Sequence, residues 1–199
     1  MQRIVVPGER LEEKPVHLEN TIIYENNTYS TVMGIYDNEK RNLVPLEGIW
    51  YPRHGDEVIG VVEEEKLNVF TVNLHSTYKG IILVKYSEGD IAPGDVIEAS
   101  VKELDKTKTV VLVRPKKLSG GKILAIKPTK IPRILGKGDS MITQLTGGTK
   151  TFIKIGMNGV LWMRGGDLDL ATRVILRIEE EAHTTGLTER IKMMLEKSV

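Results

Sequence analysis

The stretch from residue 130 to residue 162 restricts the fold more than any other part of the sequence. Within it, apolar residues recur twice at the i, i+3, i+4 spacing of one helical face, first over 131–135 and then over 141–145. The interruption between the two groups is Gly-Lys-Gly at 136–138. This pattern predicts two short helices that are joined by a glycine-bearing, cationic loop.

Such a loop is suited to binding phosphate. Gly136 and Gly138 allow the backbone to approach a phosphodiester closely, Lys137 supplies positive charge, and the following helix directs its free N–H groups toward the anion. Asp139 comes directly before the second helix, where a short polar side chain is predicted to act as an N-cap. The same carboxylate would repel a phosphate.

A β-hairpin is predicted next. The apolar runs 151–155 and 160–163 flank the turn Gly156-Met157-Asn158-Gly159, and Asn-Gly between apolar runs is a strong hairpin signal. We interpret Gly156 and Gly159 as architectural residues that pack against a neighbouring domain. A long helix with Asp167 as its cap should follow, and a last helix is predicted over 188–197.

The composition excludes several classes of site. The chain of 199 residues has no cysteine, which excludes disulfides, thiolate zinc sites and a cysteine nucleophile. Its four histidines, at positions 17, 54, 75 and 183, form no ligand pattern, so we expect neither a metal nor a cofactor. No apolar run is long enough to be a signal peptide or to cross a membrane, which predicts a soluble cytoplasmic protein.

Charge is distributed unevenly along the chain. The net charge is only +1, but residues 114–137, which we call the basic stripe, contain eight Lys or Arg and no acid. Such a run is either a solvated linker or a set of phosphate contacts, and its position beside the glycine loop favours the contacts. The candidates within it are Arg114, Lys130, Arg133 and Lys137.

The remaining sequence is rich in short strand-like runs. Residues 1–51 predict an all-β N-terminal domain with strands near 3–6, 21–24, 28–36 and 42–50, whose acidic character suits docking on a protein partner. Residues 52–115 contain five apolar runs with even spacing, which is the size of an OB-type barrel. Residues 120–199, after the glycine pair at 120–121, form the third domain.

An OB barrel binds single strands by stacking bases on aromatic rings and by contacting the backbone with cations. The candidates here are Phe70 on the second strand and His75, Tyr78 and Lys79 in the following loop, with Arg53 and Lys85 nearby. Phe70 lies between Val69 and Val72 and is equally consistent with a core position. The acidic run 63–65 is predicted to form a turn.

These features resemble known RNA-binding domains. The order helix, glycine loop, helix, hairpin and long helix resembles a KH domain, with Asp139 where the second loop glycine belongs. Gly-Asp before two strands, at 55–56 and 94–95, resembles the S1 variant of the OB fold. The expected fold class is therefore α+β and multidomain, with an all-β N-terminal domain, an S1-like OB barrel and a KH-like α/β domain.

The whole chain resembles the ribosomal-RNA-processing-protein-four family, the RNA-binding cap subunits of the archaeal exosome. The motifs behind this resemblance are Val5-Val6-Pro7-Gly8, Ile131-Pro132-Arg133-Ile134-Leu135-Gly136 and Gly156-Met157-Asn158-Gly159. The resemblance implies three copies of a non-catalytic subunit on a hexameric ring of phosphorolytic subunits. It also implies docking on that ring through the N-terminal domain, and recruitment of single-stranded RNA whose 3′ end is guided into the ring for 3′–5′ degradation.

Two alternatives remain at this stage. A transcription or ribosome-maturation factor with S1 and KH modules would have the same RNA chemistry. An intrinsic nuclease would use Asp167 and Asp169 as metal ligands, but neither a third carboxylate nor a histidine lies nearby in the sequence.

Overall fold

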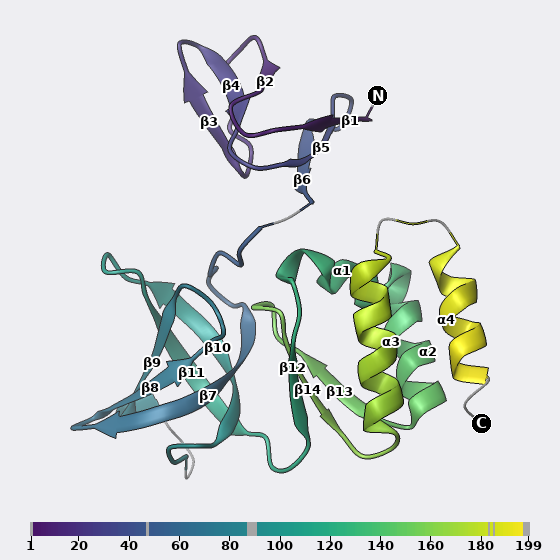
Figure 1. The fold of residues 1–199 in the computed structure, drawn as a ribbon. Helices are drawn as coiled ribbons and strands as arrows, with labels where there is room; N and C mark the ends of the chain where they lie inside the picture. Colours follow the sequence, from purple (N-terminus) through teal and green to yellow (C-terminus); the bar gives the residue numbers. More distant parts are fainter. Residues whose placement is uncertain (1, 47, 87–90, 183, 185, 197–199) are drawn as a thin grey trace. The chain divides into compact units, whose positions relative to one another are not determined.

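The computed structural model of the chain describes residues 2–46, 48–86, 91–182, 184 and 186–196. The chain divides into two compact units, Met1–Gly48 and Ile49–Val199. The second unit contains both a β-barrel and an α/β region with its own three-stranded sheet (Figure 1). Within the described residues, none of the helices combines the length and the apolar composition that a membrane crossing requires.

The first unit consists of two three-stranded antiparallel sheets, ordered β1-β5-β6 and β2-β4-β3. Its strands are β1 (Gln2–Val5), β2 (Arg10–Glu12), β3 (Thr21–Tyr24), β4 (Asn27–Ser30), β5 (Gly34–Asp37) and β6 (Asn42–Pro45). The single strand expected over 28–36 is wrong, because β4 and β5 belong to different sheets. Ser30 separates them, since its hydroxyl donates to the carbonyl oxygen of Val32 (2.6 Å) and closes a turn.

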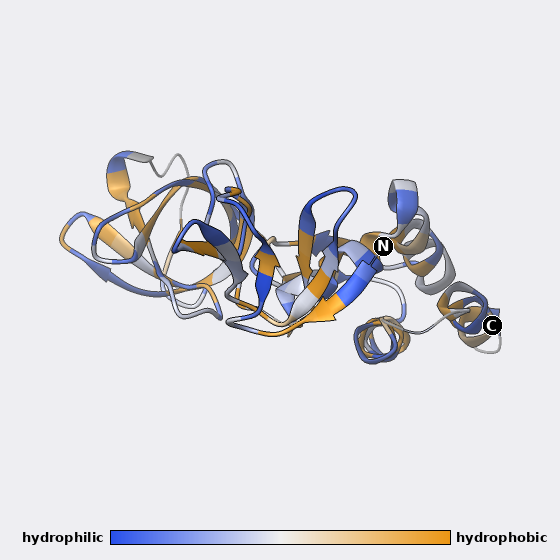
Figure 2. Cartoon of the chain, turned by 90° about the horizontal axis from the view of Figure 1, so that it is seen from above, coloured by the Kyte–Doolittle hydropathy of each residue, from blue (hydrophilic) through white to orange (hydrophobic). Residues whose placement is uncertain are grey.

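The barrel is closed by five strands in the order β10-β11-β9-β8-β7, with β7 paired to β10, which is the OB topology. The strands are β7 (Glu57–Lys66), β8 (Val69–Asn73), β9 (Lys79–Leu83), β10 (Val96–Leu104) and β11 (Thr109–Lys117), and a 3₁₀ turn, η1 (Val84–Tyr86), follows β9. Polar and apolar residues intermingle along these strands (Figure 2). Buried apolar side chains of the strands form the barrel core. The acidic turn expected at 63–65 is wrong, because these residues continue β7.

The two Gly-Asp pairs begin the barrel strands in the same way. Gly55 and Gly94 adopt positive φ angles of 87° and 93°. Each following aspartate accepts a hydrogen bond from a backbone N–H three residues earlier, Arg53 for Asp56 (3.1 Å) and Ala92 for Asp95 (2.8 Å). The Lys117 ammonium, 2.7 Å from Asp95, lowers the pKa of that carboxyl, and the Ala92 N–H contributes in the same direction. These pairs therefore form turns.

The α/β region has the connectivity of a KH-like fold. Its elements are β12 (Lys122–Ala125), η2 (Pro128–Lys130), α1 (Ile131–Leu135), η3 (Lys137–Asp139), α2 (Ser140–Thr149), β13 (Phe152–Ile155), β14 (Val160–Arg164), α3 (Leu168–Glu180) and α4 (Leu187–Glu196). The sheet order is β12-β14-β13, and the four helices contribute to one apolar core with one face of this sheet. Asp167 caps α3 as predicted, because its carboxylate accepts the Leu170 N–H at 2.8 Å.

Candidate nucleic-acid interface

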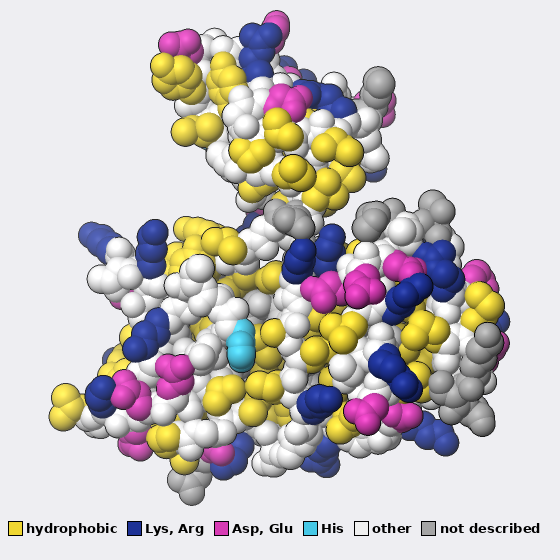
Figure 3. All heavy atoms as spheres, viewed as in Figure 1, with side chains coloured by type: hydrophobic (Ala, Val, Ile, Leu, Met, Phe, Trp, Pro, Cys, Tyr) yellow, Lys and Arg dark blue, Asp and Glu magenta, His cyan; other side chains and the backbone are white. Residues whose placement is uncertain are grey.

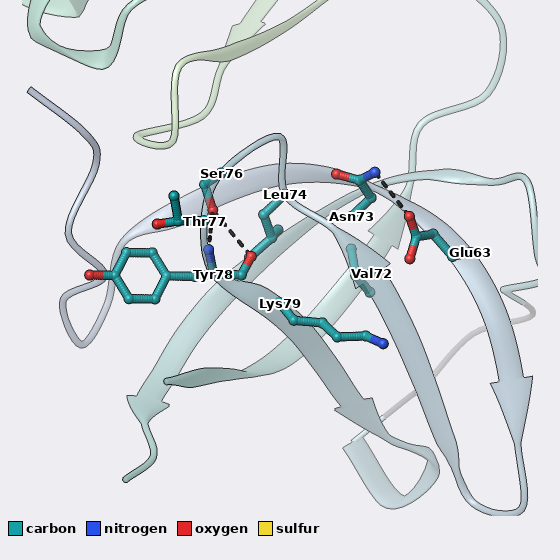
Figure 4. Close-up of a pocket in the computed structure, with 8 residues that line it drawn as sticks. All are labelled: Glu63, Val72, Asn73, Leu74, Ser76, Thr77, Tyr78 and Lys79. Carbon is teal, nitrogen blue, oxygen red and sulfur yellow. Dashed lines mark hydrogen bonds between the residues drawn. The ribbon is translucent and has the colours of Figure 1, made fainter. Parts of the chain in front are cut away.

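The loop between β8 and β9 forms an open polar pocket of about 250 Å³ (Figure 4). His75 is exposed in this loop with a positive φ of 49°, and its backbone N–H donates to Asn73 Oδ1 (2.9 Å). Tyr78 and Lys79 point in opposite directions at the start of β9, and Lys79 is exposed. The residues around the pocket are Glu63, Val72, Asn73, Leu74, Ser76, Thr77, Tyr78 and Lys79.

An aromatic cluster lies beside this loop. The half-buried Tyr78 ring meets the Trp50 and Tyr51 rings edge to face, with centroids 6.1 and 6.0 Å apart. Trp50 is buried and its indole N–H donates to Asp56 (2.9 Å), whereas Tyr51 is 61% exposed. Burial raises the pKa of Tyr78. Trp50 and Tyr51 were not among the candidates from the sequence, although an adjacent Trp-Tyr pair directly before a barrel was a visible signal.

Phe70 is not available for base stacking. Its side chain is only 6% exposed and packs in the barrel core with Val72 and Ile82. The prediction that Phe70 contacts RNA is therefore wrong, and the core interpretation holds. The reason is geometric, because inward-facing residues of a small barrel must fill its interior.

The residues of the basic stripe lie on several elements of the second unit. Arg114, Lys116 and Lys117 lie on the barrel strand β11, and the Arg114 guanidinium donates to Ser100 Oγ (2.9 Å). The second part of the stripe, residues 127–137, comes after β12. This strand is about 13 Å long and separates residues 127–137 from the end of β11 along the chain. On the face shown in Figure 3, Lys and Arg side chains are interspersed with Asp and Glu. The structure thus divides the stripe between the barrel and the α/β region.

Other predicted cations lie at separate places on the barrel. Arg53 is exposed in the turn before β7, and it has interactions within the chain. Lys85 is exposed in η1, where it borders a second pocket with Leu83 and Val84. Lys85 is therefore not among the residues around the β8–β9 pocket.

The glycine loop between α1 and α2 has three positive φ angles within four residues. Gly136, Gly138 and Asp139 have φ angles of 74°, 59° and 60°. Arg133 and Lys137 are exposed, and Lys130 is half-buried with interactions within the chain. The capping role expected for Asp139 is wrong, since its side chain makes no capping hydrogen bond. Asp139 occupies a left-handed position that glycine prefers, and aspartate is one of the residues that tolerate it.

The Gly156–Gly159 turn packs against the barrel. Asn158 is buried, and its carboxamide both accepts the Ile59 N–H (3.2 Å) and donates to the Ile59 carbonyl oxygen (2.8 Å). It also donates to the carbonyl oxygen of Leu74 (2.8 Å), the residue before His75. A Cβ atom on Gly156 would lie 2.7 Å from the Ile59 nitrogen. The turn therefore fixes one end of the β8–β9 loop.

The same turn contacts the start of the second cationic segment. The N–H of Ile126 donates to the Gly159 carbonyl oxygen (2.8 Å), and a Cβ atom on Gly159 would lie 3.0 Å from the Pro128 ring. Gly159 also has a positive φ of 84°. The β8–β9 loop and the segment that leads to Lys130 are thus joined through one turn. Among the described residues, no group of three or more His, Cys, Asp or Glu side chains is placed to hold a metal ion.

Comparison with known proteins gives relatives that match almost the whole chain. The exosome complex component Rrp4 of Methanothermus fervidus is 34% identical over 213 residues, which cover 98% of this chain and 96% of that protein. Rrp4 of Picrophilus torridus is also 34% identical, over 99% of this chain and 94% of its own length. No family model matches the chain.

A solved structure agrees with these sequences. The crystal structure of a candidate exosome complex RNA-binding protein is 30% identical and superposes with a TM-score of 0.68, covering 75% of this chain and 97% of that one. The sequence relatives and the shared fold lead to the same conclusion. The chain belongs to the family of the exosome complex component Rrp4.

Proposed function

We propose that this protein is the cytoplasmic, non-catalytic RNA-binding cap subunit of an archaeal exosome. It recruits single-stranded RNA and guides the 3′ end to a hexameric phosphorolytic ring for 3′–5′ degradation, with three copies in each complex. The observation on which the proposal depends is the match to Rrp4 exosome components over 98% of the chain. The alternative of a transcription or ribosome-maturation factor has no comparable observation in its favour.

The RNA-binding part of the proposal is supported by the β8–β9 loop and its surroundings. The loop offers an exposed imidazole at His75 and a cation at Lys79, beside the partly exposed rings of Tyr51 and Tyr78. Aromatic faces and cations are the groups by which OB folds bind single strands without sequence preference. Lys137 adds a cation in the glycine loop. We expect salt-sensitive binding with little sequence preference.

Docking on the ring is assigned to the first unit, because one of its sheets has an apolar outer row. The register of β1, β5 and β6 aligns Ile4 with Ile35 and Ile35 with Val44, so these three side chains lie side by side. Ile4 is 69% exposed and Val44 is 52% exposed. Three aligned aliphatic side chains on an open sheet are typical of a surface that another protein covers. The row therefore fits a protein partner better than RNA.

The test is to measure light-scattering mass and RNA degradation for this protein alone and mixed with the phosphorolytic ring. We expect a cap–ring complex, phosphate-dependent degradation faster than that of the ring alone, and no degradation by this protein alone. The variant Val44→Glu places a charge in the apolar row and should abolish complex formation. Leu67→Glu is the matched control, since Leu67 is 98% exposed at the β7–β8 turn and should leave assembly intact.

Each outcome separates the parts of the proposal. A protein that binds RNA but does not join the ring would be a factor of another system. A protein that degrades RNA by itself would contradict the non-catalytic assignment. If Val44→Glu assembled as well as the parent protein, docking would have to use another surface.

A further inference from the structure

The outer face of the β12-β14-β13 sheet has a part that the barrel leaves exposed. Trp162 lies on this face and is buried against Ile59 and Leu118 of the barrel side. Phe152 is two residues before Lys154, which pairs with Trp162 across the strands, so Phe152 lies on the same face. It is nevertheless 58% exposed. The exposed end of this sheet therefore presents an aromatic ring.

The Phe152 ring is held in a defined orientation. It meets the Trp162 ring edge to face, with centroids 6.1 Å apart and an interplanar angle of 75°. Trp162 is itself fixed, because its indole N–H donates to the Gly120 carbonyl oxygen (2.7 Å). Since this contact orients the ring and the Phe152 side chain remains 58% exposed, the ring offers exposed aromatic surface to a stacking ligand.

A cationic residue pairs with Phe152 across the strands. The register of β13 and β14 places Arg164 opposite Phe152, and Arg164 is exposed. Its side chain lies along the Ser119–Gly121 loop, with the guanidinium 3.4 Å from the Ser119 carbonyl oxygen. A Cβ atom on Gly121 would collide with the Trp162 indole at 3.0 Å, so this part of the loop lies close to the sheet. A planar guanidinium on the residue that pairs with an exposed aromatic residue is suited to the phosphate of a base stacked on that ring.

The groups that line the junction toward the barrel give it a positive balance. Lys154 forms an ion pair with Glu98 of β10, and Lys116 of β11 lies opposite Glu98 in the register of the barrel. With Arg164, these residues provide three cations and one anion. Lys122 is 3.8 Å from Asp169, which makes that neighbouring pair neutral. The net positive charge of this junction therefore favours a polyanion over an apolar partner.

We propose that Phe152 and Arg164 form a second contact site for single-stranded RNA, in which a base stacks on Phe152 and its phosphate pairs with Arg164. The ligand class rests on the proposed function, but this site is distinct from the β8–β9 loop. Phe152 lies at the far end of the hairpin from the Gly156–Gly159 turn, about 13 Å away along the strand. Only an RNA long enough to extend beyond the loop reaches both sites.

The test is to measure the affinity of the full chain for labelled oligouridylates of about 4 and about 16 nucleotides, the range of OB-fold site sizes. Phe152→Ala should weaken binding of the longer RNA by about tenfold, within the range expected for one stacked base, and leave the shorter unchanged. Phe152→Tyr should restore binding. Met193→Ala is the matched control, because Met193 is 51% exposed on α4 and should change neither affinity.

Photocrosslinking with 4-thiouridine in the longer RNA distinguishes the outcomes. A crosslinked peptide that contains Phe152 is the expected result. Crosslinks confined to the barrel, with unchanged affinity of Phe152→Ala, would overturn this inference and leave the proposed function standing. No binding of either RNA by the parent protein would overturn the proposed function as well. Loss of ring assembly in Phe152→Ala at unchanged RNA affinity would show that a protein covers this face.

Discussion

Asn158 is the residue whose replacement most directly tests how the two halves of the second unit are joined. Its carboxamide donates to and accepts from Ile59, as the backbone of a neighbouring strand would, and it also donates to Leu74. The pairing of β7 with β8 ends at Val61 and Asn73, so it does not reach Ile59. The asparagine side chain therefore continues the hydrogen bonding of β7 beyond the end of β8.

The expected cost of Asn158→Ala follows from these contacts. Three hydrogen bonds at about 1 kcal/mol each amount to about 3 kcal/mol, and the cost rises toward about 5 kcal/mol if water does not reach the exposed backbone groups. Asn158→Asp should cost at least as much, because a carboxylate oxygen would face two carbonyl oxygens in a buried site. The matched control is Asn68→Ala, whose exposed side chain lies in the β7–β8 turn and should change stability by less than about 0.5 kcal/mol.

The assay is urea denaturation followed by tryptophan emission, since Trp50 reports on the barrel and Trp162 on the sheet. Comparing Trp50→Phe with Trp162→Phe backgrounds separates the two signals. In the parent protein we expect both signals to change together, and in Asn158→Ala we expect a lower midpoint and a separation of the two transitions. Equal stability of Asn158→Ala and Asn68→Ala would refute the reasoning.

Three further predictions concern other parts of the chain. Burial, and then the hydrogen bond to Glu12, raises the pKa of Tyr36 to about 12. The free energy of unfolding should therefore be full below pH 10 and fall by about 3 kcal/mol as the pH rises toward 12, with tyrosinate absorbance following the ionisation. The same loss of stability in Tyr36→Phe would contradict this assignment. Asp139→Gly should stabilise the protein by about 1 kcal/mol in thermal denaturation and strengthen RNA binding. Equal RNA affinity of Asp139→Gly and Asp139→Asn would assign the gain in affinity to the removed charge alone. Replacing both Arg133 and Lys137 with alanine should weaken binding equally for all RNA sequences. The slope of log affinity against log salt concentration should fall in magnitude by about 0.7 for each lost phosphate contact. An unchanged slope would place these cations outside the interface.

Local patterns in the sequence were sufficient for most elements of the second unit. The two helical groups on either side of the glycine loop, the Asn-Gly hairpin and the five barrel runs all correspond to observed elements. The Asp167 cap was equally predictable, because an N-cap depends on residues within one helical turn. These features depend on neighbours along the chain, which is the information that a single sequence contains.

The tertiary structure decided what depends on distant residues. Phe70 has apolar residues on both sides in the sequence, and only closure of the barrel determined that its ring faces inward. Ser30 ends a strand early because β4 and β5 pair with different partners. Asn158 binds residues 99 and 84 positions away, so its role beyond a tight turn was invisible locally. Phe152 and Arg164 are brought opposite each other only by strand register. Spacing along the chain determines helices, strands and turns, whereas burial and the meeting of distant side chains arise only when the sheets close and pack.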